Sequence, residues 1–173
     1  MIAIVSLGDV RAEEITPLRP ILEDAFGREV VLGGSLPVPQ EAFEPQRGQF
    51  RAGVFLDRLA RARARDWDHV LGVVGADLFA PGLNFVFGEA DSRRRVAVMS
   101  LHRLRGDETR FDRRAATEAI HELGHAYGLG HCRDPGCVMW FSNTLAETDR
   151  KGRSFCRAHA RELIRRRLDR APA

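Results

Sequence analysis

Lysine is nearly missing from this 173-residue sequence, since Lys151 is the only lysine among 27 basic residues. The other basic residues are arginines, which keep their charge and bind carboxylates through paired hydrogen bonds. The net charge is only +3, and residues of both signs are interspersed along the chain. This pattern is typical of an ion-paired surface, and the excess of arginine is also compatible with a nucleic-acid surface, a hot habitat or a GC-rich genome.

Long apolar stretches are also lacking. No segment approaches the roughly 18 consecutive apolar residues that indicate a membrane-spanning helix. The apolar run at the amino terminus stops at Leu7 and has no basic segment before it, so it predicts a first strand and not a signal peptide. We therefore expect a cytoplasmic protein without a propeptide or a membrane association.

Cysteine is scarce as well, with only Cys132, Cys137 and Cys156 present. An odd number of cysteines in a reducing compartment argues against a disulfide framework. These residues are therefore expected to bind a metal or to remain free thiols.

Strand and helix patterns alternate in the first half of the chain. An unbroken apolar, β-branched run predicts a buried strand over Ile2–Leu7, and Thr16-Pro17 indicates the start of a helix that reaches Phe26. A short strand, a proline-rich loop, an amphipathic helix and another buried strand follow, over residues 30–32, 35–47, 49–64 and 68–75. This order predicts a mainly parallel sheet with helices packed on it.

The second half of the chain differs. Residues 83–90 and 94–101 are two predicted strands joined by residues 91–93 alone, a connection that permits only an antiparallel pair. One strand at an edge should therefore run against the others. A long helix is predicted over residues 111–129, an irregular segment over 131–148, and a last helix with a basic outer face over 156–168.

The most informative segment has the spacing H-E-x-x-H-x-x-G-x-x-H, formed by His121, Glu122, His125, Gly128 and His131. Helix positions i and i+4 share a face, so the first two histidines can hold one ion, and a turn after the glycine brings the third. Three imidazoles leave a fourth position for water, which is typical of catalytic zinc. Such a zinc activates its water and polarises a carbonyl, and Glu122 is placed to accept the proton.

A second metal site is indicated directly after the first. Cys132 and Cys137 have C-x4-C spacing, and Cys156 and His159 lie one helical turn apart. Together they form a closed Cys3His set, the pattern of a structural zinc. The alternative is three buried cysteines without a metal.

Residues 121–139, HELGHAYGLGHCRDPGCVM, resemble the archaemetzincins, zinc metalloproteases with the pattern HExxHxxGxxHC-x4-C-x-M and a later CxxC. The resemblance implies a catalytic zinc on His121, His125 and His131, and Glu122 as the general base. It also implies that Met139 is the methionine of the Met-turn beneath that site and that the cysteines bind structural zinc. Two departures occur: His159 replaces the last cysteine, and the gap from Met139 to Cys156 is one residue shorter.

The resemblance also implies a metzincin-like α/β fold. It comprises a twisted mixed sheet with one antiparallel edge strand, an active-site helix and a small C-terminal subdomain, with residues 1–130 forming the catalytic part and residues 131–173 the subdomain. We expect a monomer with two zinc ions that cleaves peptides or small proteins, more in the manner of an aminopeptidase than of a broad protease.

The substrate is expected to lie along the edge strand over residues 83–90, where Phe85, Val86 and Phe87 would line the cleft. Some metzincins carry a tyrosine after the Met-turn, but the only tyrosine here is Tyr127, inside the motif. Glu118 lies on the same helical face as His121, so it either orients an imidazole or is solvated.

Two other functions are compatible with the sequence. A metzincin-fold protein could bind zinc and peptides without turnover, and all the catalytic residues would still be present. A nucleic-acid binder could instead use the cysteine site and a stripe of arginines, namely Arg161, Arg165, Arg166, Arg167 and Arg170. The nucleic-acid hypothesis leaves the three-histidine motif unexplained and is disfavoured.

Overall fold

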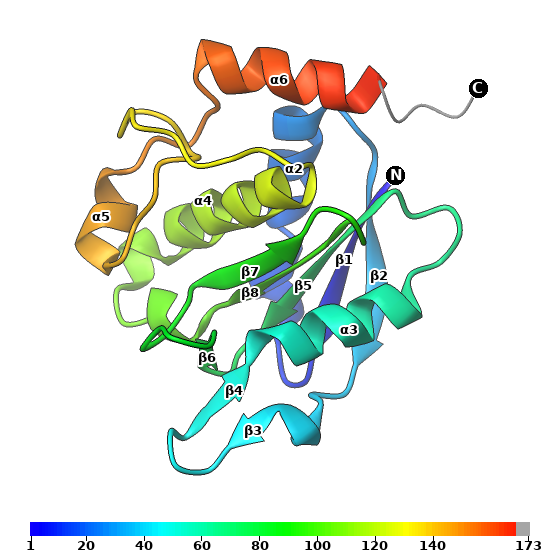
Figure 1. The fold of residues 1–173 in the computed structure, drawn as a ribbon, viewed down its shortest axis with the longest axis vertical. Coiled ribbons are helices and arrows are strands. Elements are labelled where there is room, and N and C mark those ends of the chain that lie inside the picture. Colours follow the sequence, from blue (N-terminus) through cyan, green and yellow to red (C-terminus); the bar gives the residue numbers. More distant parts are fainter. Residues whose placement is uncertain (169–173) are drawn as a thin grey trace.

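The computed structural model describes residues 1–168. Five strands form the central sheet: β1 (Ile2–Leu7), β2 (Val30–Leu36), β5 (His69–Val74), β7 (Gly88–Asp91) and β8 (Val96–Ser100). Their order across the sheet is β2-β1-β5-β8-β7 (Figure 1). All neighbours are parallel except β7, which is antiparallel to β8 at the edge. The predicted parallel sheet with one antiparallel edge strand is confirmed.

Helices cover both faces of this sheet. The helices α2 (Leu18–Phe26) and α4 (Glu108–Ala126) lie on one face, and α3 (Ala52–Ala62) lies on the other (Figure 1). Along β1, Ile2 and Ile4 pack toward α2 and α4, whereas Ala3, Val5 and Leu7 pack toward α3. Because successive side chains of a strand point to opposite faces, a strand covered on both sides is apolar at nearly every position, and Ser6 is the exception in β1.

Smaller elements complete the fold. A second sheet contains β3 (Phe43–Glu44), β4 (Gln49–Arg51) and β6 (Leu78–Phe79), and short helices include α1 (Ala12–Ile15) and α5 (Leu145–Arg150). Single-turn helices occur at η1 (Gln40–Ala42) and η2 (His102–Leu104), and α6 (Arg157–Leu168) is the last described helix. Within residues 1–168, no helix combines the length and the apolar character needed to cross a membrane.

Several predicted boundaries are wrong. The strand β2 continues through Gly33-Gly34 to Leu36, because a bare glycine fits against Trp67, whose ring would lie 2.7 Å from a β-carbon at Gly33. The predicted loop over residues 35–47 contains η1 and β3. The segment predicted as one helix over residues 49–64 consists of the strand β4 followed by the helix α3. Strands this short carry too few residues for a periodic pattern to reveal them.

Several helices begin at residues other than the predicted ones, for local reasons. The helix α2 begins at Leu18, with Pro17 outside its first turn, and α1 precedes it. The helix α4 begins at Glu108, ahead of the predicted position 111, because the Asp107 carboxylate caps it by accepting from Thr109 N. Within the segment expected to be irregular, Thr144 and Glu147 form a capping box that starts α5.

The edge strand is shorter than predicted, since β7 begins at Gly88 and the segment over residues 83–87 is not part of it. Phe87 is instead buried in the core beside α4, and Val86 bridges to Leu78 through a single backbone hydrogen bond of 2.9 Å. Phe85, Val86 and Phe87 therefore precede the strand on which they were expected. These side chains are apolar because they pack in or against the core, and not only because they lie near the edge of the sheet.

Candidate metal centre

The helix α4 places the motif between the sheet and the surface. It packs across β8, β7 and β5, so the face that carries Glu122 is turned toward β7. After Ala126 the chain leaves the helix through Gly128, whose φ of +90° is a conformation that side chains with a β-carbon disfavour. The following turn brings His131 back beside His121 and His125.

The three histidines of the motif meet at one point. His121 Nε2 and His125 Nε2 are 3.1 Å apart, and the ligand atoms of all three residues lie within 4.8 Å of one another. Nitrogen ligands bind zinc at about 2.0–2.1 Å, which corresponds to nitrogen–nitrogen separations of about 3.3 Å in a tetrahedral site. The spacing of the histidines therefore fits one zinc ion.

Hydrogen bonds decide which nitrogen of each ring is free. His121 Nδ1 donates to Val138 O and His125 Nδ1 donates to Leu129 O, each at 2.8 Å, so the hydrogens are assigned to Nδ1 because the carbonyls can only accept. The two Nε2 atoms then present lone pairs to each other across 3.1 Å. Such an arrangement is repulsive without a cation between the rings, and backbone-anchored imidazoles are characteristic of metal ligands.

The two helix-borne histidines are held in the neutral state that a metal needs. Burial lowers the pKa of His121 well below its ordinary value, and the nearby charge of Lys151 adds to this effect. Burial likewise lowers the pKa of His125 to about 4. His131 is exposed, and its pKa is lowered mainly by the smaller loss of solvation at its ring.

Glu122 lies beneath the edge strand. Its side chain is buried, and a β-carbon at Gly88 would come within 2.5 Å of Glu122 Cγ. Burial raises its pKa well above the ordinary range, the charge of Glu118 raises it further, and Lys151 opposes both effects. A carboxyl group with a raised pKa is suited to accept and return a proton near neutral pH.

Glu118 and Lys151 form a buried ion pair that the sequence did not reveal. Lys151 is completely buried, and its Nζ lies 2.9 Å from Glu118 Oε1, which also accepts from Thr148 Oγ1 at 3.3 Å. Neither sequence-based alternative for Glu118 holds, since it is not solvated and its partners are not imidazoles. The scarcity of lysine was the only available signal that Lys151 is special.

A cleft of about 800 Å³ opens beside the three histidines. Its lining includes residues of β7 and of the segment before it, among them Phe85, Val86 and Phe87, and also Phe141, Ser142 and Asn143. Leu83 and Phe141 are 49% and 46% exposed, so apolar side chains border the opening. Phe85, Val86 and Phe87 line this cleft but precede the edge strand on which they were expected, and their contact with a substrate stays a prediction.

Met139 is fully buried against the active-site helix. A β-carbon at Gly124 would lie 2.5 Å from Met139 Sδ, which places the methionine directly under the turn that ends in His125. Tyr127 points the other way, because its ring stacks on Phe26 and on His69 in the core. His69 is the first residue of β5 and is 3% exposed.

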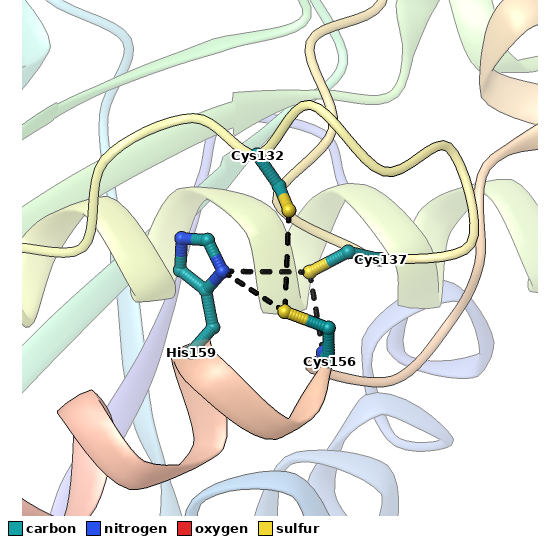
Figure 2. A group of neighbouring side chains, drawn as sticks. All are labelled: Cys132, Cys137, Cys156 and His159. Carbon is teal, nitrogen blue, oxygen red and sulfur yellow. Dashed lines mark hydrogen bonds between the residues drawn. The ribbon is translucent and has the colours of Figure 1, made fainter.

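The three cysteines and His159 form a second cluster (Figure 2). Cys132 Sγ is 3.9 Å from Cys156 Sγ, so the two are not joined by a disulfide. His159 Nδ1 lies 3.3 Å from Cys156 Sγ and 3.8 Å from Cys137 Sγ. Zinc–sulfur bonds of about 2.3 Å give ligand separations of this size, so the cluster fits a closed tetrahedral zinc site.

The predicted arginine stripe on α6 is only partly present. Arg166 donates to Glu162 and lies against Gly128, and Arg167 donates to the backbone oxygen of Gly27. These two side chains are therefore engaged within the protein and do not face a ligand. Arg161 and Arg165 are exposed, and Arg170 lies outside the described residues.

A mixed sheet with an antiparallel edge strand, a helix carrying H-E-x-x-H against it and a third histidine after a glycine turn together define a zinc metallopeptidase of the metzincin type. The family model for peptidase family M54 matches residues 35–165. The archaemetzincin of Pyrococcus abyssi is 41% identical over 177 aligned positions, covering 94% of both chains. That of Methanopyrus kandleri is 48% identical over 134 residues, covering 77% of this chain and 75% of its own.

The solved structures agree. The crystal structure of the archaemetzincin from Methanopyrus kandleri superposes with a TM-score of 0.88 at 39% identity, covering 98% of this chain and 96% of that one. The chain belongs to peptidase family M54, the archaemetzincins, and is a zinc metallopeptidase.

Proposed function

We propose that His121, His125 and His131 hold the catalytic zinc and that Glu122 is the general base for hydrolysis of a peptide bound beside β7. The observation that carries this proposal is the convergence of three imidazoles, two of them anchored through Nδ1, next to a buried carboxyl group at the floor of a cleft. When bound, the zinc would supply a water of lowered pKa and a Lewis acid for the scissile carbonyl.

The protein's own groups would carry the proton. Glu122 would accept the proton of the attacking water and pass it to the leaving amine, as its raised pKa allows. Met139 would support the site from below as the methionine of the Met-turn. No tyrosine side chain is turned toward the cleft among the described residues, so the metal would be the main partner of the developing oxyanion.

The peptide would bind as an added strand. Among the described residues β7 pairs with β8 alone, and its residues Gly88, Glu89 and Ala90 line the cleft with their other edge. An extended peptide would take up the free backbone groups of that edge, and apolar side chains would contact Phe85 and Phe141. Cleavage of small peptides, a monomeric state and a cytoplasmic location remain predictions.

A second zinc would bind the cysteine cluster. The four ligands leave no position for water, so this ion would be structural and would tie the segment after His131 to α6. We therefore propose two zinc ions per chain. The binding free energy of the second ion would be coupled to folding of the C-terminal part.

The direct test replaces Glu122 by glutamine, which keeps the shape and removes the base. Zinc content should stay unchanged while peptide hydrolysis falls by about 10²- to 10⁴-fold, the usual contribution of a positioned general base. Glu13→Gln, an exposed change remote from the cleft, is the matched control and should retain full activity. A Glu122→Gln protein that holds its zinc and cleaves peptides at the normal rate would contradict the assignment.

A further inference from the structure

His159 stands where the archaemetzincin pattern has a cysteine, and its two ring nitrogens serve two different neighbours. Nδ1 faces the sulfur atoms of the cysteine cluster (Figure 2). Nε2 lies 3.1 Å from the backbone oxygen of Gly130. Gly130 directly precedes the catalytic ligand His131, so this one ring touches both metal-binding parts of the molecule.

His131 lacks the anchor that the other two histidines have. The Nδ1 atoms of His121 and His125 are each bonded to a backbone carbonyl at 2.8 Å, whereas within residues 1–168 no hydrogen bond reaches the His131 ring. His131 is also the exposed member of the three. The placement of its imidazole therefore depends on the position of its backbone.

The cysteine cluster restrains that backbone on both sides of His131. On one side of His131, Gly130 O contacts His159 Nε2, and on the other side Cys132 contributes its sulfur to the cluster. Cys132 N also donates to Met139 O at 2.8 Å. The His131 ring packs against Phe141 at 4.8 Å between ring centroids but has no hydrogen-bond partner among the described residues, so restraints on both sides of its backbone help to fix its direction.

We propose that His159 is a positioning residue for the catalytic zinc ligand His131. Binding of the structural zinc through Nδ1 leaves the hydrogen on Nε2, which then donates to Gly130 O and fixes the backbone at His131. A thiolate at this position would close the cluster equally well but has no second atom with which to donate. This inference rests on the proposed two-zinc function and extends it, because it makes the two sites energetically coupled.

The test compares His159→Cys, which restores the four-cysteine pattern, with wild type and with Arg157→Ala. Arg157 is exposed on the same turn of α6 and serves as the matched control. Each protein, with zinc in the cysteine cluster and the three-histidine site emptied by a chelator, is titrated with Co²⁺ and followed by its visible absorption. We expect His159→Cys to bind Co²⁺ about 3- to 10-fold more weakly, as the loss of one hydrogen bond predicts, and Arg157→Ala to match wild type.

Equal Co²⁺ affinity in His159→Cys and wild type, with zinc retained in both cysteine clusters, would overturn this inference alone. Absence of Co²⁺ binding to the three histidines in every protein would overturn the proposed function as well. Nitrogen-15 NMR of wild-type zinc-loaded protein is a second measurement that needs no variant. It should show His159 with a metal-bound Nδ1 and a hydrogen-bonded Nε2–H, and an unprotonated Nε2 would contradict the proposal.

Discussion

At the scale of single residues, the buried pair of Lys151 and Glu118 is the least ordinary feature of the molecule. Both side chains are almost completely removed from water, at 0% and 2% exposed, and Glu118 lies one helical turn before Glu122 on the same face. Moving charges into a low-dielectric interior is costly, and an ion pair compensates for this only while both partners remain. Burial raises the pKa of Glu122, and the charge of Lys151 partly opposes that rise.

Replacement of Lys151 by methionine should destabilise the protein by about 3–5 kcal/mol, because it leaves the Glu118 carboxylate buried without a counter-charge. The free energy of unfolding from urea titration at neutral pH measures this effect. The double variant Lys151→Met with Glu118→Leu should recover most of the loss, since it removes both charges. A single variant as stable as wild type would show that Glu118 does not depend on Lys151.

At the scale of elements, the contact between the edge strand and the active-site helix is set by a glycine. A β-carbon at Gly88 would lie 2.5 Å from both Glu122 Cγ and Val98 O. The second of these atoms belongs to the backbone of β8 and cannot move aside. The absence of a side chain at Gly88 therefore allows β7 to approach α4 at the point where Glu122 lies.

Gly88→Ala should reduce stability by about 1–3 kcal/mol through overpacking and should also reduce peptide hydrolysis, because Glu122 or β7 must shift. Gly53→Ala is the matched control, since its β-carbon would meet nothing closer than 4.0 Å in the first turn of α3. That control should be unchanged or up to about 1 kcal/mol more stable. Thermal unfolding and initial rates distinguish the two, and normal activity in Gly88→Ala would contradict the role assigned to this contact.

The carboxylate of Asp149 in α5 binds two arginines of α4. Arg114, buried in α4, donates to both oxygens of Asp149 at 2.7 Å, and Arg110 adds a bond of 3.0 Å. The hydrogen bonds from Arg114, and to a lesser extent the bond from Arg110, lower the pKa of Asp149 to about 2. Since α5 leads directly to Lys151, this contact also holds the buried lysine in place.

Asp149→Asn should cost about 2 kcal/mol at neutral pH, in line with the shift in pKa. Because the folded pKa lies below the unfolded value near 3.8, the stabilisation is complete above that value and is lost as the pH falls through about 2. The difference between wild type and variant should therefore stay constant from pH 7 to pH 5 and shrink below pH 4. A difference that grows on acidification would contradict the ion-pair account.

At the scale of the whole molecule, the features encoded locally were the ones that could be predicted. The spacing of His121, Glu122 and His125 fixes their relation on any helix, and an apolar run such as Ile2–Leu7 indicates a buried strand in any fold with two covered faces. The antiparallel edge strand followed from a connection too short for a crossover. Each of these inferences depends only on the local sequence around the residues concerned.

What could not be predicted depends on contacts between distant segments. The strands β4 and β6 have three and two residues, and they are formed by pairing between separate segments, β4 with β3 and β6 with β4. Glu118 lies in α4 and Lys151 directly follows α5, and nothing in either local sequence indicates the partner. The start of β7 at Gly88, and hence the displacement of Phe85 from the strand, depends on the close approach of α4.

We propose that three histidines bind a catalytic zinc beside a structural one, and the amount of zinc per chain distinguishes a loaded three-histidine site from an empty one. Protein purified without added metal should contain two zinc ions per chain, and His121→Ala should contain one, because the cysteine cluster keeps its own ion. Equal zinc contents in wild type and His121→Ala, with one ion in each, would contradict the claim, since the three histidines would then contribute nothing to metal binding.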